Sequence, residues 1–190
     1  MKKTMTPEEK AINIKVKKNL MWIGIISIVI LFAGLTSAYV IAIGKPGFVQ
    51  VAVPIMFWVS AGIIATSSIS MIYAVRSAKS NRFNAVLFGS LLTFLLGVGF
   101  CVCQVLGWGQ LVDQKIFFVQ HPSGQYLYML SGVHLAHLFF GMLSLIVVLF
   151  KAMKRAYSST EHLGLEIAAM YWHFLGILWI YLLVFLQIVR

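Results

Sequence analysis

The sequence has few charged residues, and acidic ones are especially rare. Of its 190 residues, 11% are Asp, Glu, Lys or Arg, and only five are Asp or Glu. Soluble domains carry about a quarter charged residues and about 45–50% apolar ones. This chain is 61% apolar, with a mean hydropathy of +0.92. The shortage of charge excludes a soluble globular domain.

Cysteine is also scarce, with only Cys101 and Cys103 in the whole chain. Both lie in an apolar stretch long enough to be a membrane helix. Residues two apart on a helix point about 200° apart, so these two thiols can neither bond to each other nor hold one metal ion together. We expect both to be free packing residues.

Long apolar stretches occupy most of the chain. A helix needs roughly 20 mostly apolar residues to cross a bilayer. Five stretches approach or exceed that length, at 20–43, 51–75, 84–109, 124–150 and 165–189. The sequence therefore predicts an all-α fold: a single integral membrane domain over residues 1–190, built as a bundle of five transmembrane helices.

The distribution of basic residues predicts the orientation of this bundle. Twelve of the 15 Lys and Arg lie in the N-terminal segment 1–19 and in the segments 76–83 and 151–164, whereas the alternate segments carry one each, at Lys45, Lys115 and Arg190. The positive-inside rule places the N-terminus and its basic segment in the cytoplasm and the C-terminus outside. The first stretch has no signal-peptide cleavage pattern, so we expect it to be retained. The net charge of +10 is thus explained by the membrane topology, and the basic segments would also attract anionic lipids. Nucleic acid is not an expected partner.

A few polar residues interrupt the apolar stretches. His134 and His137 are three apart and share one helical face, and Glu166 and His173 are seven apart on another. Lipid offers no hydrogen-bond partner, so these faces must turn toward protein. If the fourth and fifth helices pack antiparallel, the four side chains share an interior polar seam. Gln104, roughly 8 Å from the outer end of the third stretch, is expected to pack against a neighbouring helix.

Several roles for this seam remain open. Haem or metal ligation is the most specific, because helical bundles hold cofactors between histidines of facing helices. However, a rise of 1.5 Å per residue places His173 about 12 Å, His137 about 20 Å and His134 about 24 Å from the cytoplasmic ends, which is awkward for one metal. An interhelical hydrogen-bond network is favoured instead. A proton-relay or lipid-headgroup role lies between the two, and Glu166 also suits the positive end of a helix dipole.

Two motifs resemble a known family. The fourth stretch contains Ser131-Gly132-x-His134-x-x-His137-x-x-x-Gly141, and the fifth contains Glu166-x-Ala168-Ala169-x-Tyr171-Trp172-His173-Phe174 followed by Trp179. The third adds Phe100-x-x-x-Gln104 and the first adds Phe32-Ala33-Gly34. Together they resemble subunit III of the haem-copper oxidases, the cytochrome c or quinol oxidase family, in its short five-helix form. The family commonly carries carboxylates where this chain has Ile28, Gly107 and Gly176, so a proton-feeding role that needs those groups is weakened here.

The resemblance implies a supporting subunit without catalytic, cofactor-binding or metal-binding residues of its own. It would pack on the catalytic subunit I that holds the haems and copper, beside other oxidase subunits and membrane lipids, in a bacterial plasma membrane. The chain alone should catalyse nothing, while the complex would be a proton-translocating cytochrome c or quinol oxidase of aerobic respiration. A bound phospholipid, support of proton uptake and membership of a respiratory supercomplex stay open.

Three alternatives remain. The same motifs would serve an accessory subunit of a nitric oxide reductase. A small haem b quinone-reactive membrane cytochrome would use His134, His137 or His173 as ligands. A transporter or channel ranks last, because the sequence shows no inverted repeat.

Overall fold

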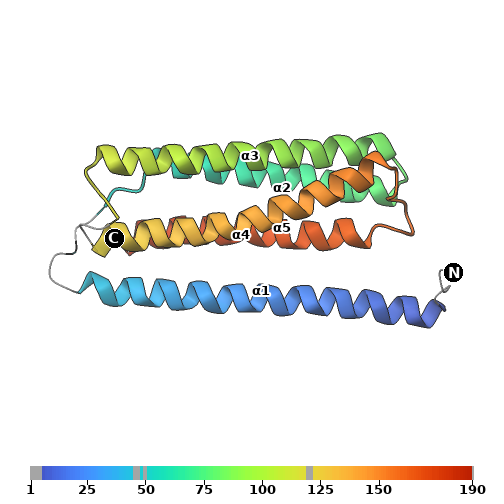
Figure 1. Cartoon of the computed structure of the whole chain (residues 1–190), viewed down its shortest axis with the longest axis horizontal. Helices are drawn as coiled ribbons and strands as arrows, with labels where there is room; N and C mark the ends of the chain where they lie inside the picture. The colour runs from blue at the N-terminus through green and yellow to red at the C-terminus, as the bar shows by residue number, and fades with distance from the viewer. Residues whose placement is uncertain (1–5, 45–47, 49–50, 119–121, 190) are drawn as a thin grey trace.

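The chain folds into five helices, seen in a computed structural model that describes residues 6–44, 48, 51–118 and 122–189 (Figure 1). They are α1 (Pro7–Ile43), α2 (Ile55–Lys79), α3 (Phe83–Asp113), α4 (Pro122–Met153) and α5 (Leu163–Ile188). All five are long and apolar enough to cross a membrane. The predicted all-α, multi-pass membrane fold is confirmed. Lys45 and Arg190, which entered the orientation argument, lie outside the described residues.

The first helix begins at Pro7, well before the apolar stretch that was expected to start at residue 20. A capping box begins it: the Thr6 side chain accepts from the Glu9 backbone N–H at 3.3 Å, and the Glu9 carboxylate accepts from the Thr6 N–H at 2.8 Å. With 37 residues, α1 is about 55 Å long, against a hydrocarbon core of about 30 Å. The basic N-terminal segment is therefore largely a helical extension of the first span. By contrast, α2 begins later than expected, directly after Pro54.

Four of the helices form a closed ring. α2 packs on α3, α3 on α4, α4 on α5 and α5 on α2, while α1 lies outside this ring against α4 and α5. Figure 1 shows the start of α1 and the end of α5 at opposite ends of the bundle. It also shows the α2–α3 and α4–α5 connections at the same end as the start of α1. The described parts of the three basic segments therefore gather at one end, which we call the basic end.

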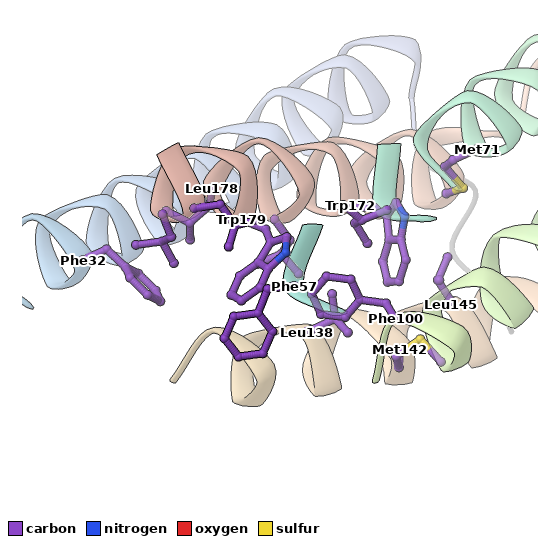
Figure 2. Close-up of a cluster of buried hydrophobic side chains, with 14 of the residues drawn as sticks. Phe32, Phe57, Met71, Phe100, Leu138, Met142, Leu145, Trp172, Leu178 and Trp179 are labelled. Atoms are coloured by element: carbon purple, nitrogen blue, oxygen red, sulfur yellow. The ribbon is translucent and has the colours of Figure 1, made fainter. Parts of the chain in front are cut away.

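Large aromatic side chains fill the centre of the bundle (Figure 2). The Trp179 ring of α5 packs in a T-shaped arrangement with the rings of Phe57 and Phe100, at centroid distances of 5.4 and 5.5 Å. All three side chains are at most 1% exposed. Edge-to-face geometry is the arrangement that aromatic quadrupoles favour. Because lipid is as apolar as the core, such close packing is what holds membrane helices together.

Two glycines of α3 allow the helices to approach this closely. A Cβ on Gly89 would lie 3.0 Å from the Ala74 Cβ of α2. A Cβ on Gly97 would lie 2.6 Å from the Met142 Sδ and 2.8 Å from the Trp172 Cη2. Small residues at such crossings are typical of membrane bundles. They bring the polar groups of α2, α3 and α5 within hydrogen-bond reach.

Candidate functional site

One buried hydroxyl joins three helices in the membrane interior. Ser60 of α2 accepts from the Gln104 Nε2 of α3 at 2.9 Å and from the Trp179 Nε1 of α5 at 3.0 Å, and it donates to the Phe57 carbonyl at 2.7 Å. A hydroxyl has one donor and two acceptor positions, and all are used here. Ser60 and Gln104 are fully buried. Gln104 therefore packs against a neighbouring helix, at a depth where water cannot replace the bond.

A second junction lies two turns closer to the basic end. Ser67 accepts from the Trp172 Nε1 at 2.9 Å, and Ser70 lies 2.7 Å from the Thr93 hydroxyl of α3. Ser60 and Ser67 are seven residues apart on α2, as are Trp179 and Trp172 on antiparallel α5. The two serine–tryptophan pairs thus lock the register between these helices. The matching seven-residue spacing is visible in the sequence, but there Trp172 and Trp179 are only motif residues, and nothing marks Ser60 as their hydrogen-bonding counterpart.

The two histidines of α4 lie among aromatic rings. His134 is fully buried and stacks on Trp179 at a centroid distance of 5.0 Å, with the Phe100 and Phe32 rings edge-on to it. Neither of its ring nitrogens has a hydrogen-bond partner within the described part of the chain. The His137 Nδ1 lies 2.8 Å from the Val133 carbonyl of its own helix. These contacts make His134 a packing residue against α5.

Glu166 and His173 lie on the other side of α5, toward α2. Both line a groove of about 330 Å³ between α2 and α5. The Glu166 carboxylate is 2.9 Å from the Lys79 Nζ of α2 and 3.0 Å from the Lys18 Nζ of α1, with the His162 Nε2 at 3.3 Å. This single carboxylate therefore links α1, α2 and α5 at the basic end. Its place in the first turn of α5 also suits the helix dipole.

The structure thus brings Glu166 and His173 to one groove, and His134 and His137 to the contacts with Phe32. Over the described residues, no hydrogen bond or ion pair connects these two pairs. The seam that unites all four stays a prediction. Over the same residues, no group of three or more His, Cys, Asp or Glu comes together as a metal site, and Cys101 and Cys103 are free thiols.

The positions where the resembling family carries carboxylates are packed here against side chains of the bundle. A Cβ on Gly107 would collide with the Phe57 ring, so that ring occupies the space of a side chain at this position. A Cβ on Gly176 would lie 3.4 Å from the Ser68 Oγ and 3.5 Å from the Ile64 Cγ1. Ile28 is partly buried against the core. All five acidic residues of the chain lie outside the middle of the spans, at or near helix ends: Glu8, Glu9, Asp113, Glu161 and Glu166.

Comparison with known proteins agrees with the two sequence motifs. A sequence model of the family described as cytochrome c oxidase subunit III matches residues 9–189. Cytochrome c oxidase subunit 3 of Spodoptera frugiperda is 28% identical over 120 residues, which are 63% of this chain and 80% of that protein.

Two bacterial relatives match less of their own length. Cytochrome c oxidase subunit 3 of Bacillus sp. (strain PS3) is 26% identical over 68% of this chain and 62% of that protein. The protein of the same name from Alkalihalophilus pseudofirmus is 28% identical over 63% of this chain and 59% of that protein. The chain therefore spans about three-fifths of these two relatives. Because the family match runs through all five helices, the chain belongs to the cytochrome c oxidase subunit III family, the third subunit of haem-copper oxidases.

Proposed function

We propose that the chain acts as a non-redox subunit that packs on catalytic subunit I of a haem-copper terminal oxidase and stabilises it. The observation that carries this proposal is how the interior polar groups are used. Ser60 and Ser67 bind Gln104, Trp179 and Trp172 across helix boundaries. Such bonds fix a rigid bundle. The haems and copper belong, in this proposal, to the partner subunit.

The outer surface suits lateral contact with another membrane protein. α3 and α4 expose large apolar side chains along their outer faces, among them Leu95, Val102, Phe139 and Phe140. Rigid helices that present such side chains can pack against a neighbouring span and against lipid. We place the basic end in the cytoplasm of a bacterium, since positive-inside topology and bacterial relatives both support it.

In this proposal the chain provides no path for protons through its interior and no free carboxylate that collects them at the basic end. Glu166 is held between Lys18, Lys79 and His162, and the positions of Ile28, Gly107 and Gly176 supply no carboxylate to the interior. Glu166→Gln should therefore leave turnover and proton uptake of the assembled oxidase unchanged at alkaline pH. Slower proton uptake in this variant would establish a proton-collecting role for Glu166.

The assembly itself is tested by purifying the chain through an N-terminal tag in a mild detergent. We expect haem absorption bands together with a many-helix catalytic partner identified by mass spectrometry. The partner's identity distinguishes an oxygen reductase from a nitric oxide reductase. A Soret band from the chain without any partner, lost on His134→Ala or His173→Ala, would contradict the proposal and favour a single-chain haem b cytochrome.

A further inference from the structure

Two connections at the basic end are joined to each other by one side chain. They are the turn 80–82 between α2 and α3 and the segment 154–162 between α4 and α5, which Figure 1 shows next to each other. The Asn81 Nδ2 donates to the Ser159 Oγ at 3.3 Å, and the Ser159 backbone N–H donates to the Asn81 Oδ1 at 2.8 Å. These two bonds hold the connections together as one unit, which we call the paired turns.

An arginine occupies an unusual backbone position in the paired turns. α4 ends in a turn in which the Ala156 N–H donates to the Lys151 carbonyl at 3.0 Å. Arg155, the residue before Ala156, has a φ of 52°. Helices that end in this way usually carry glycine at such a position, because a Cβ is sterically unfavourable at positive φ. Positive-inside topology asks only for basic residues on one side of the membrane, so it does not explain an arginine at this particular position.

Two arginines line an open hollow beside the paired turns. The hollow has a volume of about 370 Å³, and its lining consists of Arg82, Arg155 and residues 83–85 at the start of α3. Both arginine side chains are exposed. All five Asp and Glu of the chain lie among the described residues, where every ion pair involves Glu166 and none involves an arginine. Two guanidinium groups therefore line one hollow without an acidic partner among the described residues.

From this arrangement we propose that the paired turns bind an acidic segment of a partner protein outside the hydrocarbon of the membrane, with a carboxylate in the hollow between Arg82 and Arg155. Arginine suits this role because its planar guanidinium can donate two parallel hydrogen bonds to one carboxylate. The bonds between the paired turns fix the two backbones before the partner arrives, which lowers the entropy lost on binding.

The lining favours a protein carboxylate over a lipid headgroup as the occupant. Phe83 and Ala85 are its only apolar residues, so it offers no continuous apolar surface along which an acyl chain could lie. The site goes beyond the proposed function, which names no docking chemistry and does not involve these residues.

Site-specific photocrosslinking in native membranes tests the proposal. A benzophenone side chain replaces Asn84, which is exposed and lines the hollow without being one of the two arginines. After irradiation, mass spectrometry should identify a crosslink to a segment of another protein that lies outside its spans and is rich in Asp and Glu. The same benzophenone at the exposed Lys10 of α1, which is not in the lining, is the positional control and should not reach that segment.

Arg155→Gly separates docking from folding. Glycine adopts positive φ freely, so this variant should be at least as stable as the unaltered chain. Its crosslink yield should nevertheless fall about fivefold, the effect of losing one partly solvated charged pair. Lys154→Gln is the charge control, because it removes a neighbouring positive charge that does not line the hollow, and it should keep the yield.

Three outcomes would overturn the proposal: an equal loss of yield in Arg155→Gly and Lys154→Gln, a crosslinked segment without acidic residues, or crosslinks from Asn84 to phospholipid alone. The first would mean that net charge explains the binding, and the last that the hollow takes a lipid headgroup. An acidic, Arg155-dependent partner that belongs to no haem-containing complex would leave the docking site standing and would contradict the proposed oxidase role.

Discussion

Replacing Ser60 by alanine should destabilise the bundle by about 2 kcal/mol. Ser60 is the shared acceptor for the Gln104 Nε2 and the Trp179 Nε1. Removing its hydroxyl leaves both buried donors unpaired, at a depth where water cannot reach them. Bonds between membrane helices contribute about 0.6 to 2 kcal/mol each, so losing two gives about 1 to 4 kcal/mol. Two kcal/mol corresponds to about a 30-fold change in the unfolding equilibrium constant.

The assay is reversible unfolding of the purified chain in mixed detergent micelles, followed by circular dichroism. Ser27→Ala is the control, because the exposed Ser27 hydroxyl donates only to the Ile23 carbonyl of its own helix, at 3.0 Å. We expect the control to change the free energy of unfolding by less than about 0.5 kcal/mol, as for most exposed substitutions.

A double-mutant cycle tests the same junction more strictly. Gln104→Leu removes one of the two donors, so adding it to Ser60→Ala should cost less than the sum of the single changes. The reasoning is refuted if Ser60→Ala is as mild as Ser27→Ala, or if the two changes are additive. Additivity would mean that Ser60 and Gln104 do not depend on each other for stability.

Three further predictions use the same unfolding assay. Gly97→Leu should lower the free energy of unfolding by about 1 to 3 kcal/mol, because its Cβ would lie 2.6 Å from the Met142 sulfur. Gly109→Leu is the control, since no atom lies within 4 Å of a Cβ at that position. Equal effects of the two changes would contradict the packing argument. His134→Phe should be neutral or slightly stabilising, because both imidazole nitrogens lack a partner among the described residues; a clear loss of stability would show that the imidazole does have one. Asn81 has a positive φ of 56°, so Asn81→Ala should lower the free energy of unfolding by about 1 to 2 kcal/mol, and by more than Asn81→Gly does. Equal losses in the two variants would show that the backbone conformation is not the cause.

The number, type and order of the helices could be predicted from the sequence because a bilayer leaves little choice. Each span must satisfy its own backbone hydrogen bonds, so an apolar run of sufficient length becomes a helix whatever its neighbours are. The start of α1 cannot be predicted from apolar content, because 1–19 is rich in charge. The sequence does, however, contain a capping-box pattern that predicts a helix start, formed by Thr6, Pro7 and Glu9.

The candidate site was less accessible from sequence. Helical spacing predicts that Glu166 and His173 share one face of α5, and in the structure both line the groove between α2 and α5. It could not show that Glu166 would bind lysines from two other helices. Nor could it show that His134 would stack on Trp179. Those contacts depend on how the helices rotate and cross.

The sequence by itself determined that this is a five-span membrane protein with a basic end, and two motifs were enough to indicate its family. Both follow from local composition and order along one chain. Only the tertiary structure decided that Ser60 accepts hydrogen bonds from Gln104 and Trp179, that Phe57 fills the space beside Gly107, and that Lys18 and Lys79 meet at the Glu166 carboxylate. The physical reason is that polar side chains in a membrane find partners across helix boundaries, and those boundaries exist only after close packing has fixed rotation and register.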